Sequence, residues 1–294
     1  MVKETANNSH LPLRVVVPDF EELIPNDTLS ESHQNIEFRI SSDYQWKMPE
    51  YIESISRKNF TKNWPIESLE TYLEEPLNFC AAMIDGGDAD LMISGYNNSL
   101  DKVTQTGIRI IGMKSKSKWV YSSSLLKAPE SDTYFTFADC TLIPEPSVDQ
   151  LVRIAFQSVL FHKKITGIDP FLAFISFSTK GSFKHYRVDR TVEALKKFKI
   201  KYPDIRAEGE LMFDDALFLG LPEEFKSELK IPMTPNVFIF PNMDGGNVAL
   251  KITRTLAGFD HVGSLIHGLN YPVWILDNYT SFSDVIRLIK LLKY

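Results

Sequence analysis

The stretch FLAFISFSTKGS at Phe171–Ser182 decides the fold class, because an apolar run ends there in hydroxyl residues and a glycine. An apolar run of this length that is followed by turn residues predicts a buried β-strand leading into a loop. A helical pattern follows it at Asp189–Tyr202, and another precedes it at Ser147–Thr166. The alternation predicts βαβ units, with helices covering a largely parallel sheet.

The same alternation extends along the chain and predicts the α/β class throughout. Residues 18–50 are the exception, since they carry three prolines and little helical periodicity. The other predicted strands are Leu13–Val17, Leu91–Ser94, Trp119–Ser123, Phe135–Asp139, Val237–Phe240 and Val273–Leu276. The other predicted helices are Ile66–Gly86, Ser99–Ile111, Gly245–Ala257 and Phe282–Leu292.

Composition excludes several functional classes. The 294 residues are 44% hydrophobic and 24% charged, as in globular proteins, and the formal net charge of −6 argues against nucleic acid. The two cysteines, Cys80 and Cys140, form no CxxC motif or Cys/His cluster, so we expect reduced thiols and no metal. The polar N-terminus and the lack of a long apolar run predict a soluble cytoplasmic protein with no membrane partner.

Three segments carry residue types that suit chemistry. Ser176–Ser182 gathers hydroxyls, backbone N–H groups and one lysine at a strand end, which suits an anion or an ordinary βα loop. Gly209–Ala216 holds three carboxylates, which suit a metal, proton transfer or a solvated turn. Pro241–Asn247 is glycine-rich, and either approaches a ligand closely or forms a tight turn.

Six blocks of sequence, taken in order and with their spacing, resemble the phosphate acetyl/butyryltransferase family over about residues 76–294. The blocks are Gly87–Gly95 (GDADLMISG), Phe135–Cys140 (FTFADC), Ser176–Ser182 (SFSTKGS), Gly209–Ala216 (GELMFDDA), Asn236–Lys251 (NVFIFPNMDGGNVALK) and Gly268–Pro272 (GLNYP). The resemblance implies two α/β/α domains with mostly parallel sheets in a phosphotransacetylase-like, isocitrate/isopropylmalate dehydrogenase-like topology. It also implies a cleft between the domains and a homodimer. The expected division is 1–130 plus 268–294 for the first domain and 131–267 for the second.

The resemblance also implies roles for individual residues in the reaction of acyl-CoA with phosphate. Asp284 falls on the carboxylate proposed as the base, and Asp214 on the aspartate of the GEL-x-x-D-A block. The expected phosphate loop consists of Ser178, Thr179, Lys180, Gly181 and Ser182. The expected border of the CoA site consists of Asn242, Asp244, Gly245 and Asn247. CoA or acyl-CoA is a substrate or ligand here, and no bound cofactor or catalytic metal is implied.

Other positions depart from the family pattern. Asp277 and Asn278 stand where the family has its oxyanion-stabilising serine and substrate-binding arginine, and Gln105 stands in place of a second arginine. Arg57 is a weaker match for a further substrate-binding arginine. A carboxylate at Asp277 about 4 Å from phosphate would repel it by about 4 kcal/mol at an effective dielectric constant near 20.

Two functional hypotheses follow. The first is a divergent phosphate acyltransferase, acetyl or butyryl, in which the lost serine and arginine weaken turnover. The second is a non-catalytic domain of the same fold, a pseudoenzyme that binds acyl-CoA or a partner. The segments Tyr96–Asp101 (YNNSLD) and Pro272–Leu276 (PVWIL) resemble the non-catalytic copy of this domain that is fused to some malic enzymes.

Overall fold

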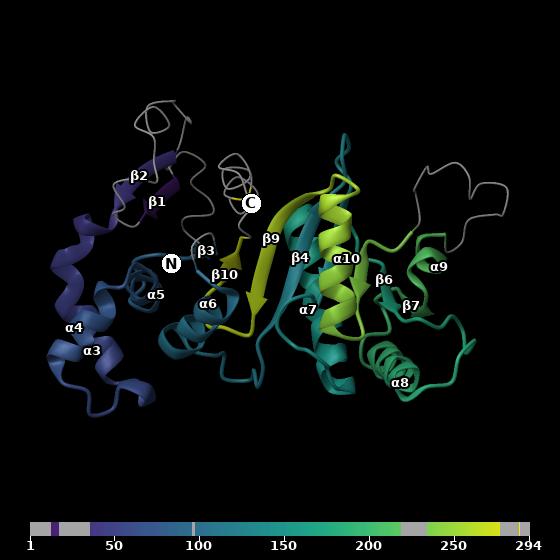
Figure 1. Ribbon diagram of the computed structural model, residues 1–294, viewed down its shortest axis with the longest axis horizontal. Coiled ribbons are helices and arrows are strands. Elements are labelled where there is room, and N and C mark those ends of the chain that lie inside the picture. Colours follow the sequence, from purple (N-terminus) through teal and green to yellow (C-terminus); the bar gives the residue numbers. More distant parts are fainter. Residues whose placement is uncertain (1–12, 18–35, 96–97, 219–233, 277–287, 289–294) are drawn as a thin grey trace. The chain divides into compact units, whose positions relative to one another are not determined.

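The structure, a computed structural model, forms two compact units (Figure 1). It describes residues 13–17, 36–95, 98–218, 234–276 and 288. Among these, the first unit takes the residues up to Ser115 together with Leu269–Val273, and the second takes Lys116–Gly268 and continues from Trp274. The division expected from sequence, 1–130 plus 268–294 and 131–267, stays a prediction.

The first unit is rich in helices, and a proline corrects one sequence expectation. The single helix predicted over Ile66–Gly86 is two helices, α4 (Ile66–Glu74) and α5 (Pro76–Asp85). Pro76 cannot donate a backbone hydrogen bond and forces Glu75 into an extended conformation, so the first helix ends there. The remaining elements are β1 (Leu13–Val17), β2 (Ile36–Ile40), η1 (Ser41–Lys47), α3 (Met48–Ser56), η2 (Asn59–Thr61), β3 (Met92–Ser94), α6 (Leu100–Thr106) and η3 (Gly107–Ile111).

The second unit is built on a mixed sheet with the strand order β10-β9-β4-β5-β8-β6-β7. The pairs β5–β8, β8–β6 and β6–β7 are parallel, whereas β4 runs antiparallel to both β5 and β9. The strands are β4 (Tyr121–Lys127), β5 (Tyr134–Ala138), β6 (Leu172–Ile175), β7 (Ala207–Leu211), β8 (Val237–Ile239), β9 (Asp260–His267) and β10 (Val273–Ile275). The helices are α7 (Val148–Thr166), α8 (Tyr186–Lys201), α9 (Phe213–Leu217) and α10 (Met243–Thr255).

Alternating side chains of the parallel strands divide between two hydrophobic cores. Leu172 and Phe174 of β6 pack with residues of α7 and α8, whereas Ala173 and Ile175 pack with residues of α9 and α10. Each fully buried Leu, Ile or Phe side chain contributes about 1.5–3 kcal/mol to stability. The second unit is therefore a three-layer α/β/α arrangement, with α10 in front of the sheet in Figure 1.

The α/β class expected from sequence is confirmed, but sequence analysis missed several elements. Strands β2, β7 and β9 and helices α3 and α9 were not expected, and the segment Gly209–Ala216, expected near a turn, lies in β7 and α9. Strand β9 has a bulge opposite β4 and carries Gly263, where an added Cβ would lie 2.2 Å from the indole nitrogen of Trp274. The predicted helix Phe282–Leu292 lies outside the described residues, apart from Leu288.

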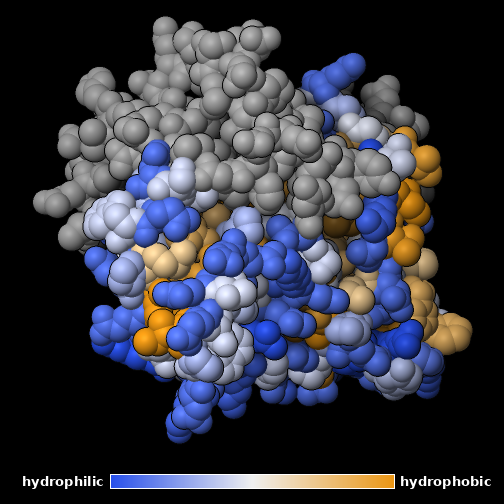
Figure 2. All heavy atoms as spheres, turned by 60° about the vertical axis from the view of Figure 1, so that its left-hand side comes forward, coloured by the Kyte–Doolittle hydropathy of each residue, from blue (hydrophilic) through white to orange (hydrophobic). Residues whose placement is uncertain are grey.

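Within the described residues, no helix is both long and apolar enough to cross a bilayer, and no three His, Cys, Asp or Glu side chains gather as metal ligands. Cys80 and Cys140 are both free thiols. Hydrophilic residues cover most of the coloured face in Figure 2, and hydrophobic residues form smaller patches on it.

A buried histidine lies between β5 and the core face of α7. His162 is fully buried, its Nδ1 atom lies 3.0 Å from the hydroxyl of Thr136, and its Nε2 atom has no hydrogen-bond partner among the described residues. Burial lowers the pKa of His162 from 6.5 to about 4, because the charged imidazolium would lose its hydration. The histidine is therefore neutral in the folded protein at pH 7.

This burial predicts a loss of stability in mild acid. Between pH 6.5 and 4 the unfolded chain binds a proton at His162 that the folded chain does not, so the free energy of unfolding falls as pH falls. The fall is about 2 kcal/mol between pH 6.5 and 5. We expect urea titrations to show that His162→Gln lacks this part of the pH dependence. If the free energy of unfolding depends on pH equally in the wild-type protein and in His162→Gln, the prediction is contradicted.

Candidate active site

The carboxyl ends of four neighbouring strands in the second unit meet at one edge of the sheet. Strands β5, β8, β6 and β7 are parallel, so the loops that follow them emerge on the same side. These loops contain the three segments that the sequence analysis singled out. Ligands of open α/β sheets bind at such an edge, so this edge is the candidate active site.

The serine-rich loop after β6 is shaped by a buried carboxylate from the neighbouring strand. Glu210 on β7 is only 4% exposed. Its Oε1 atom accepts hydrogen bonds from the hydroxyl of Ser178 (2.9 Å) and the backbone N–H of Gly181 (2.7 Å). Lys180 and Gly181 have φ values of 51° and 83°, a left-handed turn that points backbone N–H groups inward. The carboxylate thus occupies donors of the loop that an external anion would use.

The other hydroxyls of this loop are also engaged within the protein. Thr179 donates to the carboxylate of Asp215 and accepts from the N–H of Met212 at 2.9 Å. The Ser182 hydroxyl accepts from the N–H of Thr179 at 3.0 Å. Asp214, the residue expected from sequence, is exposed in the first turn of α9, and its neighbour Asp215 makes the contact. The lysine of the loop, Lys180, remains 60% exposed and lies 3.6 Å from Glu208.

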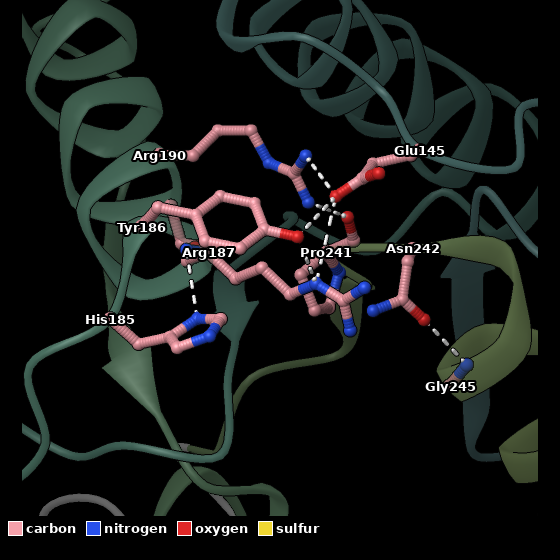
Figure 3. A network of polar contacts seen from close by, with 9 residues as sticks. Glu145, His185, Tyr186, Arg187, Arg190, Pro241, Asn242 and Gly245 are labelled. Atoms are coloured by element: carbon pink, nitrogen blue, oxygen red, sulfur yellow. Dashed lines mark hydrogen bonds and ion pairs between the residues drawn. The ribbon is translucent and has the colours of Figure 1, made fainter.

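An arginine and glutamate network joins the neighbouring loops (Figure 3). Arg190 on α8 donates to Glu145, in the loop after β5, and to the carbonyl of Pro241, in the loop after β8, both at 2.9 Å. Hydrogen bonding to Arg190 and the nearby Arg187 hold the pKa of Glu145 below its ordinary value. Arg187 lies 3.6 Å from the same carboxylate and is 44% exposed, so its guanidinium also faces solvent.

The residues expected to border CoA have mainly local contacts in the structure. Asn242 caps α10, since its Oδ1 atom accepts from the N–H of Gly245 at 2.8 Å. Asn247 donates to the carbonyl of Cys140 at 3.1 Å. An added Cβ on Gly246 would lie 2.8 Å from the carbonyl of Asp139, so the start of this helix packs tightly against the β5 loop. Asp244 is exposed. Hydrogen bonding to Tyr186 raises the pKa of Arg187, and the charges of Glu145 and Asp244 add to this effect.

A buried aspartate holds the β5 loop in place. Asp139 is 1% exposed and accepts hydrogen bonds from the hydroxyl of Ser122 and from the N–H groups of Thr141 and Ile143. Burial raises the pKa of Asp139, and these hydrogen bonds lower it in part. These contacts indicate a structural role for the aspartate of the FADC block, which holds the β5 loop in place.

Aromatic side chains stand exposed beside the serine-rich loop. Phe177, Phe183 and Tyr186 are between 50% and 57% exposed. The ring of Phe177 lies 5.6 Å from those of Phe183 and His185, and His185 lies 4.6 Å from Tyr186. Exposed rings that contact one another and flank cationic residues suit a ligand with both apolar and phosphate groups.

The first unit has a polar pocket of its own, of about 290 Å³. Gln105 lines it, one helical turn before Arg109. Burial raises the pKa of Tyr72, and the nearby charge of Arg109 lowers it in part. Arg109 lies 5.9 Å from the ring of Phe60, and no described carboxylate lies within ion-pairing distance of it. Lys102, in the same pocket, is paired with Glu75. The remaining lining residues are Thr71, Asn78 and Thr106.

The predicted site residues therefore divide into three groups. The phosphate-loop and CoA-border residues lie at the carboxyl edge of the second unit. Gln105 and Arg57 belong to the first unit, where Arg57 ends α3 and pairs with Glu53 on the surface. Asp277, Asn278 and Asp284 lie outside the described residues, so their roles stay predictions.

Sequence analysis missed Glu145, Arg187 and Arg190 as site residues. The two arginines are three residues apart in the first turns of a helix that follows the serine-rich loop, which puts them on one face. The sequence HYRVDR (His185–Arg190) contains this spacing and could have indicated two neighbouring arginines. Nothing in the sequence indicated the role of Glu210, apart from its position among the three carboxylates of Gly209–Ala216.

Comparison with known proteins gives a consistent result. A family model described as phosphate acetyl/butaryl transferase matches residues 24–292. The phosphate acetyltransferase of Thermoanaerobacterium thermosaccharolyticum is 31% identical over 79% of this chain and 72% of its own length. That of Mycoplasma capricolum is 32% identical over 76% of this chain and 69% of its own.

Solved structures agree with these matches. The EutD phosphotransacetylase from Staphylococcus aureus superposes with a TM-score of 0.72 at 29% identity, covering 91% of this chain and 81% of its own. A phosphotransacetylase from Streptococcus pyogenes superposes with a TM-score of 0.70 at 28% identity, covering 90% and 80%.

We predict that the buried carboxylate of Glu210 stabilises the fold, because it accepts hydrogen bonds from the loop after β6. Glu210→Ala leaves the Ser178 hydroxyl and the Gly181 N–H without their acceptor, and we expect the free energy of unfolding to fall by about 2–4 kcal/mol. Glu208→Ala on the same strand removes only exposed ion pairs and should cost under about 1 kcal/mol. Denaturant titration of both variants tests this, and equal costs would contradict the assigned role.

Proposed function

The chain belongs to the phosphate acetyl/butyryl transferase family, and from that premise we propose that it transfers an acetyl group between CoA and inorganic phosphate. Acetyl is proposed over butyryl because the curated relatives cited above are phosphate acetyltransferases. The observation that carries the proposal is the grouping, at one sheet edge, of a serine-rich loop, exposed cations and exposed aromatic rings.

The reaction sets the requirements of the site. A phosphate oxygen attacks the thioester carbonyl, the carbonyl oxygen gains negative charge, and the CoA thiolate leaves. Phosphate needs cations close by, and the developing oxyanion needs a hydrogen-bond donor. Lys180 and Arg187 are exposed cations in and beside the serine-rich loop, so we assign them to phosphate or to the phosphates of CoA.

The aromatic residues complete this assignment. Phe177, Phe183 and Tyr186 offer apolar area next to Arg187, and we assign them to the pantetheine or adenine portion of CoA. The N-terminal turn of α10, with Asn242, Asp244, Gly245 and Asn247, borders the same edge. Asp284 remains the proposed base. The homodimer, the cytoplasmic location and the cleft between domains also stay predictions.

A second candidate function is acyl-CoA binding without turnover. It is favoured by Glu210, whose carboxylate takes up donors of the loop that should hold phosphate. It is also favoured by Gln105, which brings no charge to the first-unit pocket where the family pattern has an arginine. Under this hypothesis CoA binds measurably, but phosphate releases no thiol from acetyl-CoA.

A thiol-release assay separates the two candidates. Purified protein is mixed with acetyl-CoA and phosphate, and free CoA thiol is followed with a chromogenic reagent. We expect phosphate-dependent release that is lost in Asp284→Asn and about 10- to 100-fold slower in Arg187→Gln, since a charge-assisted contact is removed. Lys163→Gln, which removes an exposed lysine on α7, is the matched control and should keep full activity. Absent release together with CoA affinity in calorimetry supports the binding candidate.

The residues at 277 and 278 provide a separate test. Replacing Asp277→Ser together with Asn278→Arg removes a carboxylate and restores the hydroxyl and guanidinium of the family pattern. We expect the double variant to raise the rate of thiol release by about 10²-fold or more, because it removes charge repulsion and adds an oxyanion donor. The single variant Asn278→Gln is the control. An unchanged rate in a folded double variant would contradict the assignment of these two positions.

A further inference from the structure

The second unit contains a pocket of about 430 Å³ that shares no residue with the candidate active site. It is formed by the segment before β4, the first turns of α7 and the last turns of α8. Its volume falls within the range of small-molecule sites, about 300–1,000 Å³. The lining residues are Lys116, Ser117, Lys118, Trp119, Asp149, Val152, Arg153, Lys197 and Lys201.

The lining is strongly cationic. Four lysines and one arginine line the pocket with one carboxylate, that of Asp149, which lies 3.4 Å from Lys197. Outside the lining, Glu193 on the same helix lies 3.5 Å from Lys197. The chain as a whole carries a formal charge of −6, so this concentration of positive charge runs against the average composition. Cations held together repel one another, and a bound polyanion relieves that repulsion. The pocket therefore favours an anionic ligand of high charge.

Two of the lining cations lie close to tyrosine side chains of the protein. Burial raises the pKa of Tyr121, and the nearby guanidinium of Arg153 lowers it in part. A guanidinium presents its N–H donors in a planar fork, which matches the geometry of phosphate oxygens. Lys201 lies 5.4 Å above the ring of Tyr202, which is stacked on Phe156 at 4.1 Å.

The pocket also contains an aromatic surface. Trp119 is 37% exposed, so part of its indole is open to a ligand. A planar base stacks on an exposed indole whatever its identity, and adjacent phosphates bind to Arg and Lys. The combination of one accessible ring and several cations matches a mononucleotide better than it matches a bare phosphate.

We propose that this pocket binds a nucleoside polyphosphate, with the base on Trp119 and the phosphates on Arg153, Lys197 and Lys201. Lys116 and Lys118 provide further charge at the rim. The site is independent of acyl transfer, because none of its residues takes part in the proposed reaction. The pocket is thus proposed as a second ligand site, separate from the active site, that binds nucleotides.

The experiment uses ADP as the probe and calorimetry on the full-length protein as the readout. The test variant is Lys197→Gln with Lys201→Gln. The matched control is Lys196→Gln with Lys199→Gln, which removes the same charge from the same helix at positions that do not line the pocket. We expect ADP affinity to fall about 100-fold in the test variant, about tenfold for each lost contact, and to stay within threefold in the control.

Comparing ligands tests the nucleotide assignment. Adenosine should bind at least tenfold more weakly than ADP, and so should pyrophosphate, because each lacks one half of the expected contacts. Trp119→Ala should bring ADP affinity down to that of pyrophosphate. Equal losses in both double variants, equal binding of pyrophosphate and ADP, or no ADP binding at about 1 mM would each overturn the proposal. Displacement of ADP by a single-stranded oligonucleotide at far lower concentration would overturn it in favour of nucleic acid.

Discussion

The buried carboxylate of Glu210 is the interaction on which the proposed site depends. A charge that is almost fully buried is tolerated only when its oxygens are hydrogen-bonded, and here Ser178 and Gly181 provide the donors. This requirement fixes the left-handed turn at Lys180 and Gly181. Gly209, the residue before Glu210, allows β7 to approach β6 closely, since an added Cβ would lie 2.8 Å from the Cβ of Phe174. The serine-rich loop is thus positioned by its neighbour strand rather than by its own sequence.

This arrangement changes how the loop would act on phosphate. Donors that are already paired with Glu210 contribute to an external anion only if they exchange partners, and such an exchange leaves the carboxylate unpaired at a cost of about 1–3 kcal/mol or more. Cationic side chains that are not paired with Glu210 meet no such cost. Lys180 and Arg187 are both more than 40% exposed and are paired only with carboxylates that are themselves partly exposed. The electrostatic work of substrate binding therefore falls mainly on these two side chains.

Sequence alone predicted the α/β class and the loops of the second unit, because apolar runs of the right length end there in serine, glycine and asparagine. It could not predict that Asp215 rather than Asp214 contacts Thr179, since adjacent helical residues differ by about 100° in direction. It also could not pair Glu145 with Arg190, which are far apart in sequence and meet only through the order of β5, β8 and β6. Strand β9 was not predicted because Gly263, Ser264 and the polar pair Asp260 and His261 leave no apolar alternation in the sequence.

The distribution of charge, rather than its sum, decides what this protein binds. Acyl-CoA, phosphate and nucleotides are all anions, and a chain with a formal charge of −6 should repel them on average. At physiological ionic strength, however, charges in solvent are screened beyond about 8 Å, so an approaching anion responds to the side chains near its contact point. In the serine-rich loop those side chains include Lys180, and around Trp119 they include Arg153, Lys197 and Lys201. Local groups of cations thus allow a protein of net negative charge to present two separate proposed anion-binding surfaces in one unit.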